Sequence, residues 1–368
     1  MQIDRLSLRG FRNYEDAQAQ FVPGVNLLVG GNANGKTNLL EAVSYLSTGR
    51  SFRTRREAEL IRFGADFAEL RAQVQSQERT RELRAVLFTG RRPRQLWLAG
   101  VRQRSRAALS GVLTSVLFCP EDLMILKKGA SGRRRLMDGV ICQLRPNYEA
   151  ALAEYGRLLD QKSALLRERY DNPSLLQVLP EYDLRMAQTG ALVISYRARY
   201  VKALAQEAAR YHREFSGDSE TLELTYRTVS TVTDPFAPPE TLCAQLQEHQ
   251  RSHARAELES AQCLSGPHKD DFEAVINGLP VAQFASQGQT RTAALSLKLA
   301  EREIFHDEFD EYPVLMLDDV LSELDAQRQA FVLNRIGGGQ TLITCCEDAR
   351  IAERTGGRVL TVQNGGIR

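Results

Sequence analysis

The spacing of apolar residues predicts a chain that alternates between strands and helices. Near the N-terminus, Ile3, Leu6 and Leu8 mark a strand, and Val25–Val29 marks a short buried strand that precedes helical sequence at 38–43. Phe67–Gln75, Leu83–Phe88 and Gln95–Leu98 alternate as strands do, and the last two flank a basic turn at 90–94. These segments predict an antiparallel sheet beside a strand–turn–helix unit.

Two long segments with helical spacing occupy the middle of the chain. They run from Asn147 to Tyr170 and from Glu181 to Phe215, and Asp171-Asn172-Pro173 breaks the pattern between them. At 1.5 Å per residue the resulting helical hairpin reaches only about 35–50 Å. The sequence therefore predicts a short helical arm and not a long coiled coil.

The remaining third returns to mixed strands and helices. A strand is expected at Leu222–Tyr226 and a charged helix from Glu240 to about Ser260, and Asn277-Gly278 predicts a type I′ hairpin that closes 272–276 against Val281. A long helix is expected over 290–309. Buried strands are expected at 313–317 and 340–345, with a helix opened between them by 322–325. Together the elements indicate an α/β fold.

The turn after Val25–Val29 carries a phosphate-binding pattern. Residues 30–37 read Gly-Gly-Asn-Ala-Asn-Gly-Lys-Thr and fit G-x-x-x-x-G-K-[ST] between a strand and a helix. Successive backbone N–H groups in such a turn form a nest for phosphate oxygens, and the N-terminus of the helix adds to the attraction. A glycine-rich turn that arises by chance is the alternative. The lysine, the threonine and the flanking elements favour a nucleoside triphosphate site.

Two side chains of this turn have separate chemical tasks. Lys36 can reach the β- and γ-phosphates, and the Thr37 hydroxyl can ligate Mg²⁺. We expect Lys36 to be a solvated ligand contact, so that its removal abolishes ATP binding without unfolding the chain.

Two segments downstream of the arm fit the second half of such a site. Ser286-Gln287-Gly288-Gln289 opens the helix at 290–309, and its glycine and helix N-terminus would make a second phosphate-binding surface. The apolar strand at 313–317 ends in Asp318 and Asp319. Asp318 suits a Mg²⁺ ion shared with Thr37, and Asp319 suits the polarisation of an attacking water. Alone, the first pattern is weak and the second is also found in helix-capping turns.

Overall composition places the chain among soluble proteins. It has 368 residues, of which 43% are hydrophobic and 26% are charged, and no apolar run approaches the roughly 18 residues of a membrane span. Met1–Arg5 shows no secretory pattern, and the six cysteines show neither a C-x-x-C pair nor zinc spacing. These features indicate a cytoplasmic protein with reduced thiols.

The net charge of +2 conceals an uneven distribution. Residues 50–145 contain 21 Lys and Arg against 9 Asp and Glu, a local net of +12. Such a split suggests a polyanionic partner such as DNA. Arg53, Arg55 and Arg56 follow the expected P-loop helix and are the candidates for DNA contact, although arginines spread over several solvated faces would give the same count.

His249 and His253 lie four residues apart, a spacing that can hold zinc. No carboxylate or third ligand is suitably placed, so we expect two solvated histidines.

The order of the P-loop, S-x-G-Q, the apolar strand with two aspartates and Ser322-Glu323-Leu324-Asp325 resembles the ATP-binding cassette (ABC) ATPases, in the branch shared with SMC proteins. A closer resemblance, over essentially the whole chain, is to the RecF family of bacterial recombination mediators. It rests on segments 10–14 (GFRNY), 49–54 (GRSFRT), 118–123 (FCPEDL), 133–135 (RRR), 266–271 (GPHKDD) and 317–325.

The resemblance implies an ABC-type P-loop ATPase head with a mixed sheet, an antiparallel β subdomain and an inserted α-helical arm. The expected division is residues 1–145 and 216–368 for the head and 146–215 for the arm. It implies a homodimer driven by ATP and Mg²⁺, in which the signature residues contact ATP on the opposite subunit. Lys36 and Asp319 would be catalytic, and Thr37 and Asp318 would hold the metal. The expected nucleotide contacts are Gly30, Gly31, Asn32, Ala33, Asn34, Gly35, Lys36, Thr37, Asn38, Ser286, Gly288 and Gln289.

By the same resemblance, the chain would act on double-stranded, gapped or junction DNA with RecR and RecO and assist RecA loading, with roles in replication and the SOS response. Most ABC ATPases have Glu where this chain has Asp319, so we expect slow hydrolysis that serves as a switch. The usual switch histidine is absent, and Thr344 is the nearest candidate. Residues 119–122 are a candidate γ-phosphate-sensing loop. The ATPase subunit of a membrane transporter and an SMC-type tether are alternatives, which Asp319, the short arm and the arginine excess disfavour.

Overall fold

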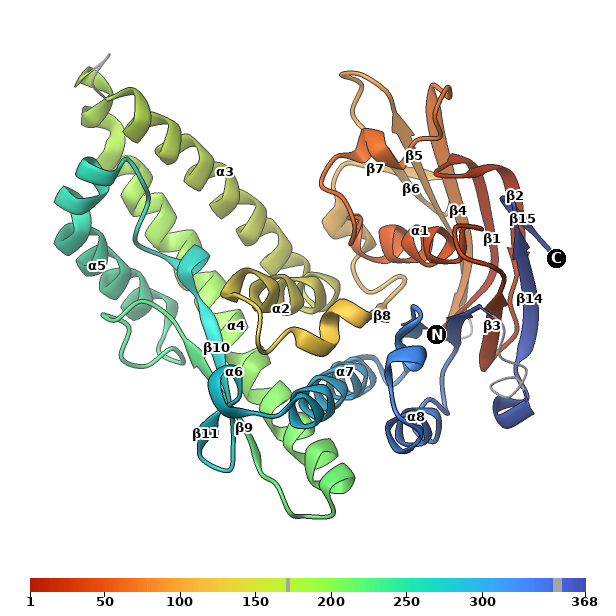
Figure 1. Ribbon diagram of the computed structural model, residues 1–368. Coiled ribbons are helices and arrows are strands. Elements are labelled where there is room, and N and C mark those ends of the chain that lie inside the picture. The colour runs from red at the N-terminus through yellow and green to blue at the C-terminus, as the bar shows by residue number, and fades with distance from the viewer. Residues whose placement is uncertain (78, 170–172, 347–352) are drawn as a thin grey trace. The chain divides into compact units, whose positions relative to one another are not determined.

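The computed structural model describes residues 1–77, 79–169, 173–346 and 353–368, which form two compact units (Figure 1). Unit 1 comprises Met1–Met124 and Arg291–Arg368, and unit 2 comprises Ile125–Thr290. Their limits differ from the division expected from the sequence, which remains a prediction about functional domains.

Unit 1 contains two six-stranded sheets. The antiparallel sheet has the order β2-β1-β4-β5-β6-β7, and the second sheet has the order β15-β14-β3-β13-β12-β8, in which β14, β3, β13, β12 and β8 are parallel. Their bounds are β1 Gln2–Phe11, β2 Tyr14–Gln20, β3 Val25–Val29, β4 Phe67–Ser76, β5 Arg79–Phe88, β6 Gln95–Leu98, β7 Val101–Gln103, β8 Ser115–Phe118, β12 Val314–Leu317, β13 Thr341–Cys345, β14 Arg358–Gln363 and β15 Gly366–Ile367.

Period-two alternation decides which face of the antiparallel sheet is buried. Leu6 and Leu8 on β1 are buried, whereas Arg5 and Arg9 on either side of them are exposed. The buried face packs in one core with α1 (Lys36–Thr48) and with apolar residues of β12 and β13. The P-loop helix is therefore held against both sheets. Helix α8 (Ala326–Leu333) and α7 (Gln287–Phe309) from Arg291 onward complete this unit, whereas the first residues of α7 belong to unit 2.

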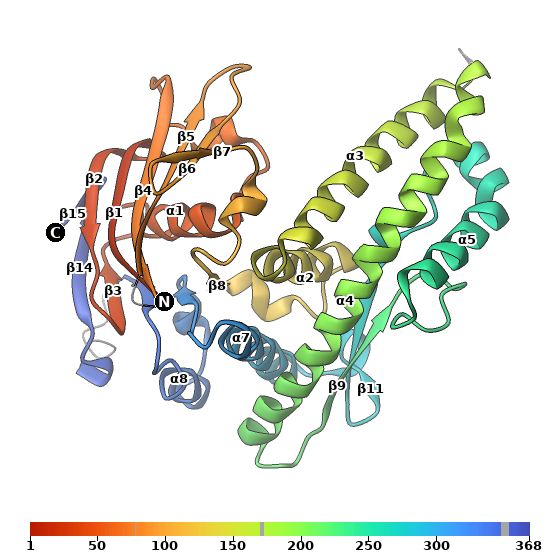
Figure 2. The same cartoon turned by 180° about the vertical axis from the view of Figure 1, so that it is seen from behind.

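Unit 2 is mainly helical (Figure 2). Its helices are α2 Ala130–Leu144, α3 Pro146–Glu168, α4 Leu179–Ser216, α5 Pro239–Ser260 and α6 Val281–Phe284, and its small antiparallel sheet has the order β11-β10-β9, with β9 Leu222–Arg227, β10 Asp271–Ile276 and β11 Leu279–Pro280.

A buried ionic cluster connects the helices of unit 2 to the 266–271 segment. Arg197 on α4 is 3% exposed; its Nε donates to Asp138 Oδ1 at 3.0 Å and its Nη1 donates to Asp270 Oδ2 at 3.0 Å and to the Pro267 carbonyl at 2.6 Å. Removal of one partner from such a buried pair would leave an uncompensated charge. The polar segment 266–271 thus has a structural role in this unit.

Most expected elements are present, with three corrections. The sequence reasoning missed β2, because the tight turn at Arg12-Asn13 has no glycine; Arg12 itself adopts φ +52°. Val281 begins α6, and the hairpin partner of β10 is Leu279-Pro280. His249 is buried, since its Nδ1 lies 2.7 Å from Ser265 Oγ and its ring stacks on His253.

Of the expected break at Asp171-Asn172-Pro173, the first two residues lie outside the described residues, and Pro173 begins a 3-10 helix, η4 (Pro173–Val178). Among the helices that are described, none is long and apolar enough to cross a membrane.

Candidate nucleotide site

The P-loop connects β3 to α1 through backbone conformations that favour glycine. Gly35 has φ +111°, and a Cβ there would lie 2.6 Å from Asn13 Nδ2. A Cβ on Gly30 would lie 2.1 Å from the Val362 carbonyl oxygen, so β14 leaves no room for a side chain. Ala33 adopts φ +65°, a left-handed conformation that costs an alanine roughly 1–2 kcal/mol. The loop holds its shape because the surrounding strands impose it.

Two residues of the β1–β2 turn brace this loop. Asn13 Nδ2 donates to the Asn34 carbonyl at 3.0 Å, and Tyr14 Oη donates to the Gly35 carbonyl at 2.9 Å. The bonds fix these carbonyls away from the phosphate side, which leaves the neighbouring N–H groups turned toward it. Sequence reasoning noted the 10–14 segment only as part of a resemblance and assigned it no role.

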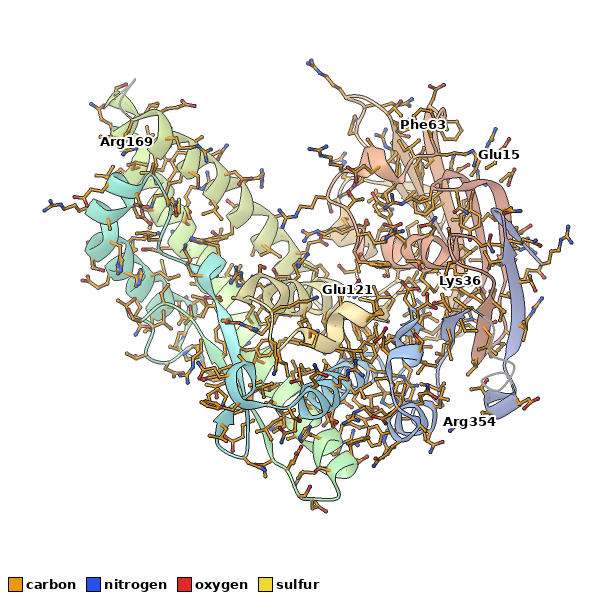
Figure 3. The ribbon with its side chains drawn as sticks, in the orientation of Figure 1. Glu15, Lys36, Phe63, Glu121, Arg169 and Arg354 are labelled. Atoms are coloured by element: carbon orange, nitrogen blue, oxygen red, sulfur yellow. The ribbon has the colours of Figure 1, made fainter. Side chains whose placement is uncertain are left out.

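Lys36 is buried, which corrects the expectation of a solvated side chain. It is 4% exposed, and its Nζ donates to the carbonyls of Gly30 at 2.6 Å and Gly31 at 3.2 Å, with Cys346 Sγ at 3.7 Å. The ammonium group therefore contacts the carbonyls at the start of the loop. Lys36 is the first residue of α1 and is labelled in Figure 3. Its position is suited to compensating phosphate charge.

The Thr37 hydroxyl meets a carboxylate from the far end of the chain. Thr37 Oγ1 donates to Asp318 Oδ1 at 2.9 Å across 281 residues of sequence. Hydroxyl and carboxylate oxygens in this arrangement are the ligands that Mg²⁺ takes beside nucleotide phosphates. The two residues predicted to share a metal are thus in direct contact.

Thr344 fixes both aspartates at the end of β12. Its Oγ1 donates to Asp318 Oδ1 at 3.0 Å and accepts from the Asp319 N–H at 2.8 Å, and Asp319 adopts φ +50°. Thr344 is 2% exposed. The side chain considered as a substitute for the switch histidine therefore faces the acid pair, because β13 lies beside β12 in the parallel sheet.

Asp318 is 7% exposed, and burial raises its pKa above the usual range, with the charge of Asp319 adding to that shift. The hydrogen bonds from Thr37 and Thr344 oppose it because they stabilise the ionised form. A buried carboxylate with few compensating charges is a favourable ligand for a divalent cation.

Arg53 belongs to the nucleotide side of unit 1. Its Nη1 donates to Asn38 Oδ1 at 2.7 Å and lies 3.7 Å from the buried carboxylate of Glu41, and Asn38 Nδ2 donates to Asn13. Glu41 is also held by a bidentate contact from Arg12 at 2.7 and 2.8 Å. These contacts connect the segment after α1 to the start of α1.

Arg55 and Arg56 are exposed. Arg53 is exposed as well, but its guanidinium group contacts Asn38 and Glu41, whereas no such contact is described for the other two.

Ser286 and Gln289 form a reciprocal cap at the N-terminus of α7, within unit 2. Ser286 Oγ accepts from the Gln289 N–H at 3.1 Å, and Gln289 Oε1 accepts from the Ser286 N–H at 2.9 Å. A serine hydroxyl that accepts in this way keeps its own hydrogen for a further acceptor. The cap therefore presents an exposed O–H group, and the half-buried Gly288 follows it without a side chain.

The candidate γ-phosphate loop after β8 is internally bonded. Asp122 Oδ2 accepts from the Cys119 N–H at 3.1 Å and lies 3.7 Å from Lys298 Nζ on α7. Burial raises the pKa of the Cys119 thiol. No observation assigns this loop to a phosphate, and that role stays a prediction.

Within the described part of the chain no cluster of three or more His, Cys, Asp or Glu side chains is arranged to hold a metal ion. A Mg²⁺ ion at Thr37 and Asp318 would therefore take its other ligands from the nucleotide and from water, as is usual for this ion.

Comparison with known proteins places these features in a family. The family model described as "RecF/RecN/SMC N terminal domain" matches residues 2–363. The "DNA replication and repair protein RecF" of Acetivibrio thermocellus is 36% identical over 99% of this chain and 98% of its own length. That of Symbiobacterium thermophilum is 41% identical over 96% of this chain and 94% of its own length.

Solved structures give the same result. The recombination mediator protein RecF-ATPrS in the RecFOR pathway superposes with a TM-score of 0.92 at 31% identity, over 100% of this chain and 97% of that chain. RecF-ATP gives a TM-score of 0.90 at 32% identity, over 100% and 96%. The Smc head domain of Pyrococcus furiosus, at 18% identity, 100% and 95% coverage and a TM-score of 0.56, shares the fold.

The fold class expected from the sequence, an ABC-type ATPase head with an inserted helical arm, is confirmed. A family model over nearly the whole chain, relatives above 35% identity and the two RecF structures agree, and the chain belongs to the RecF/RecN/SMC family, among its RecF proteins.

Proposed function

We propose that this protein is an ATP-dependent DNA-binding protein of recombinational DNA repair, in which ATP binding joins two copies on DNA and slow hydrolysis releases them. The observation that carries the proposal is the contact between Thr37 and Asp318. It brings the P-loop and the paired aspartates into one site, as the sequence predicted, beside a loop already shaped for phosphates.

The backbone and side chains of that site have separate roles. The backbone of residues 30–35 and the ammonium group of Lys36 bind the phosphate chain, and Thr37 and Asp318 would hold a Mg²⁺ ion, which would supply positive charge to offset that of the phosphates. Asp319 orients the attacking water. Its carboxylate is one methylene shorter than that of glutamate, which supports slow turnover suited to a switch.

The cap at Ser286 supports a head-to-tail dimer. The free hydroxyl hydrogen of Ser286 and the N-terminus of α7 offer donors for a γ-phosphate. In the proposed dimer these donors serve the nucleotide of the other copy, so that neither copy completes a site alone. ATP then acts as the link between copies.

The resemblance to RecF proteins supports the partners RecR, RecO and, through them, RecA at gapped or junction DNA, with a cytoplasmic location. Neither the family model nor the relatives named above is a transporter subunit, so that alternative is not proposed.

Sedimentation velocity of the protein with ATP, Mg²⁺ and a gapped duplex tests the proposal. We expect a monomer without nucleotide, a dimer with ATP and Mg²⁺, and cosedimentation with the DNA. A sedimentation coefficient that does not change when ATP is added would contradict the nucleotide-linked dimer. Copurification with membranes in place of DNA binding would contradict the function as a whole.

A further inference from the structure

Two stretches of unit 1 that are remote in sequence carry an unusual excess of arginine. Residues 50–59 and 90–106 together contain ten arginines and two glutamates. The first stretch follows α1 and includes a short 3-10 helix, η1 (Glu57–Leu60), and the second runs from the β5–β6 hairpin through β6 and β7. A local excess of this size suggests a polyanionic partner.

The structure brings the two stretches together. Arg94, at the base of the β5–β6 hairpin, donates to the Gly49 carbonyl at 2.9 Å and to Tyr45 Oη at 3.3 Å, and it pairs with Glu57 on η1. Gly49 has φ +62°, and a Cβ there would lie 2.0 Å from Cδ of Arg106, so the side chain of Arg106 passes directly over the end of α1.

Strand register places the remaining arginines on the same end of the sheet. Leu96 pairs with Gln103 and Val86 pairs with Gln95, so Arg104 emerges beside the base of the hairpin. The loop before β4 reaches this end too, because the Thr89 N–H donates to the Asp66 carbonyl at 3.1 Å; Phe63 of that loop is labelled in Figure 3 and is fully exposed.

Eight of the ten arginines are exposed, and for seven of these no carboxylate partner is described in the part of the chain that the structure covers. We call these seven the arginine rim: Arg50, Arg55, Arg56, Arg91, Arg92, Arg102 and Arg104. The other three are Arg94, paired with Glu57; Arg53, which contacts Asn38 and Glu41; and Arg106, over Gly49.

Some exposed arginines in the rest of the described chain are paired. Arg251 and Arg255 on α5 contact Glu248 and Glu259 within one helical turn, and Arg227 on β9 contacts Glu273. Others, such as Arg157 and Arg199, have no described ion pair, so the rim is distinguished by its density of arginines and not by the lack of partners. Its guanidinium groups repel one another, and that of Arg92 lies over the Phe88 ring, 3.9 Å from its centroid. A ligand that offers a closely spaced row of anions would remove that repulsion.

We propose that the arginine rim is the DNA-contacting surface of unit 1 and that it binds the phosphate backbone of duplex DNA. Guanidinium groups match phosphate oxygens in geometry, and duplex DNA presents one phosphate charge for roughly every 1.7 Å of its axis. This assignment rests on the proposed function and changes its predicted contact set: Arg55 and Arg56 remain, Arg53 is excluded, and the hairpin arginines are added.

The rim also has a path to the nucleotide site. Helix α1 begins at Lys36 and ends beside Gly49, so its 13 residues span about 20 Å between the P-loop and the rim. Arg53 follows the rim end of α1 in sequence and contacts Asn38 at the other end. Helix α1 and the contact between Arg53 and Asn38 therefore join the DNA-contacting surface to the phosphate-binding loop.

The test compares two triple variants with the wild-type chain. Arg91, Arg92 and Arg104 are changed to Ala in the rim variant, and Arg227, Arg251 and Arg255 are changed to Ala in the control. Binding of a fluorescent 30-base-pair duplex is followed by anisotropy with ATP and Mg²⁺ over 50–300 mM KCl. Thermal unfolding and ATP binding of each variant establish that it is folded.

We expect the rim variant to lose tenfold or more in affinity at the lowest salt. The slope of log K against log salt should fall by about 0.9 for each lost contact, up to about 3 in total. The control should keep the wild-type slope, and replacement of the same rim residues by Lys should restore it.

Each contrary outcome has its own meaning. Equal slopes in the rim variant and the wild type overturn the rim and leave the proposed function standing, whereas a wild-type chain that binds no DNA overturns the function. Equal losses in rim and control variants would show that net charge alone governs binding. Displacement of the duplex by poly-glutamate as effectively as by unlabelled DNA would make the rim a site for acidic proteins instead.

Discussion

Replacement of Thr344 by valine tests how the acid pair is positioned. Valine has nearly the same shape as threonine but has no hydroxyl, so the change removes the bond to Asp318 Oδ1 at 3.0 Å and the bond from the Asp319 N–H at 2.8 Å. Asp318 keeps its bond from Thr37. The Asp319 N–H loses the acceptor that holds this residue at φ +50°.

The magnitude follows from these contacts. An unsatisfied buried N–H costs about 1–3 kcal/mol, and a bond to a charged group is worth about 1.5–3 kcal/mol, part of which Thr37 retains. If about 2 kcal/mol of this is lost from the transition state for hydrolysis, the rate falls by about 30-fold at 1.4 kcal/mol per decade. We therefore expect single-turnover ATP hydrolysis to fall by about 10–100-fold, while ATP affinity changes by less than tenfold.

Two further variants make the result decisive. Thr344→Ser keeps the hydroxyl and should restore most of the rate. Thr341 lies on the same strand, is fully buried and has no described partner for its hydroxyl, so Thr341→Val should leave rate and stability unchanged or slightly improved. The reasoning is refuted if Thr344→Val hydrolyses ATP at the rate of Thr341→Val.

Four other outcomes are expected. Lys36→Ala should abolish ATP binding in a folded protein, although loss of its bonds to the loop carbonyls should also loosen the P-loop. An ATP affinity within a few-fold of wild type in equilibrium dialysis would contradict the phosphate role. Ser286→Arg should bind ATP but sediment as a monomer, whereas Ser286→Asn, which keeps a cap, should fold equally well; an ATP-dependent dimer of the arginine variant would rule out contact across the dimer. Asp319→Asn should bind Mg-ATP and accumulate dimers with little turnover, whereas Asp318→Asn should require more Mg²⁺; identical Mg²⁺ titrations of the two would show that their roles are not separate. Burial lowers the pKa of His268 to about 4, so the unfolded chain binds more protons than the folded chain below about pH 6.5, and the free energy of unfolding should fall from there toward pH 4. His268→Gln should flatten this pH dependence in urea titrations. An unchanged pH dependence would contradict the role given to His268.

The local elements and the phosphate loop could be predicted from the sequence because each depends on neighbours in the chain. Period-two alternation identified β4 to β6, and helical spacing identified α3, α4 and α7. The eight residues of the P-loop are contiguous, and their glycines, lysine and threonine have to stand in that order for the loop to hold phosphate. The paired aspartates were identified because a buried strand ends directly before them.

Tertiary structure decided which side chains meet, since packing joins residues that no spacing relates. Asn13 and Tyr14 brace the P-loop only because β1 and β2 lie beside it, and Thr344 reaches the aspartates only because β13 pairs with β12. The sequence gives a net charge of +12 for residues 50–145. Only the fold shows that Arg53 donates a hydrogen bond to Asn38, whereas no carboxylate partner is described for the arginine rim. The burial of Lys36 and His249 could not be predicted for the same reason. The exposure of a side chain depends on how the whole chain packs around it and not on the residue type alone.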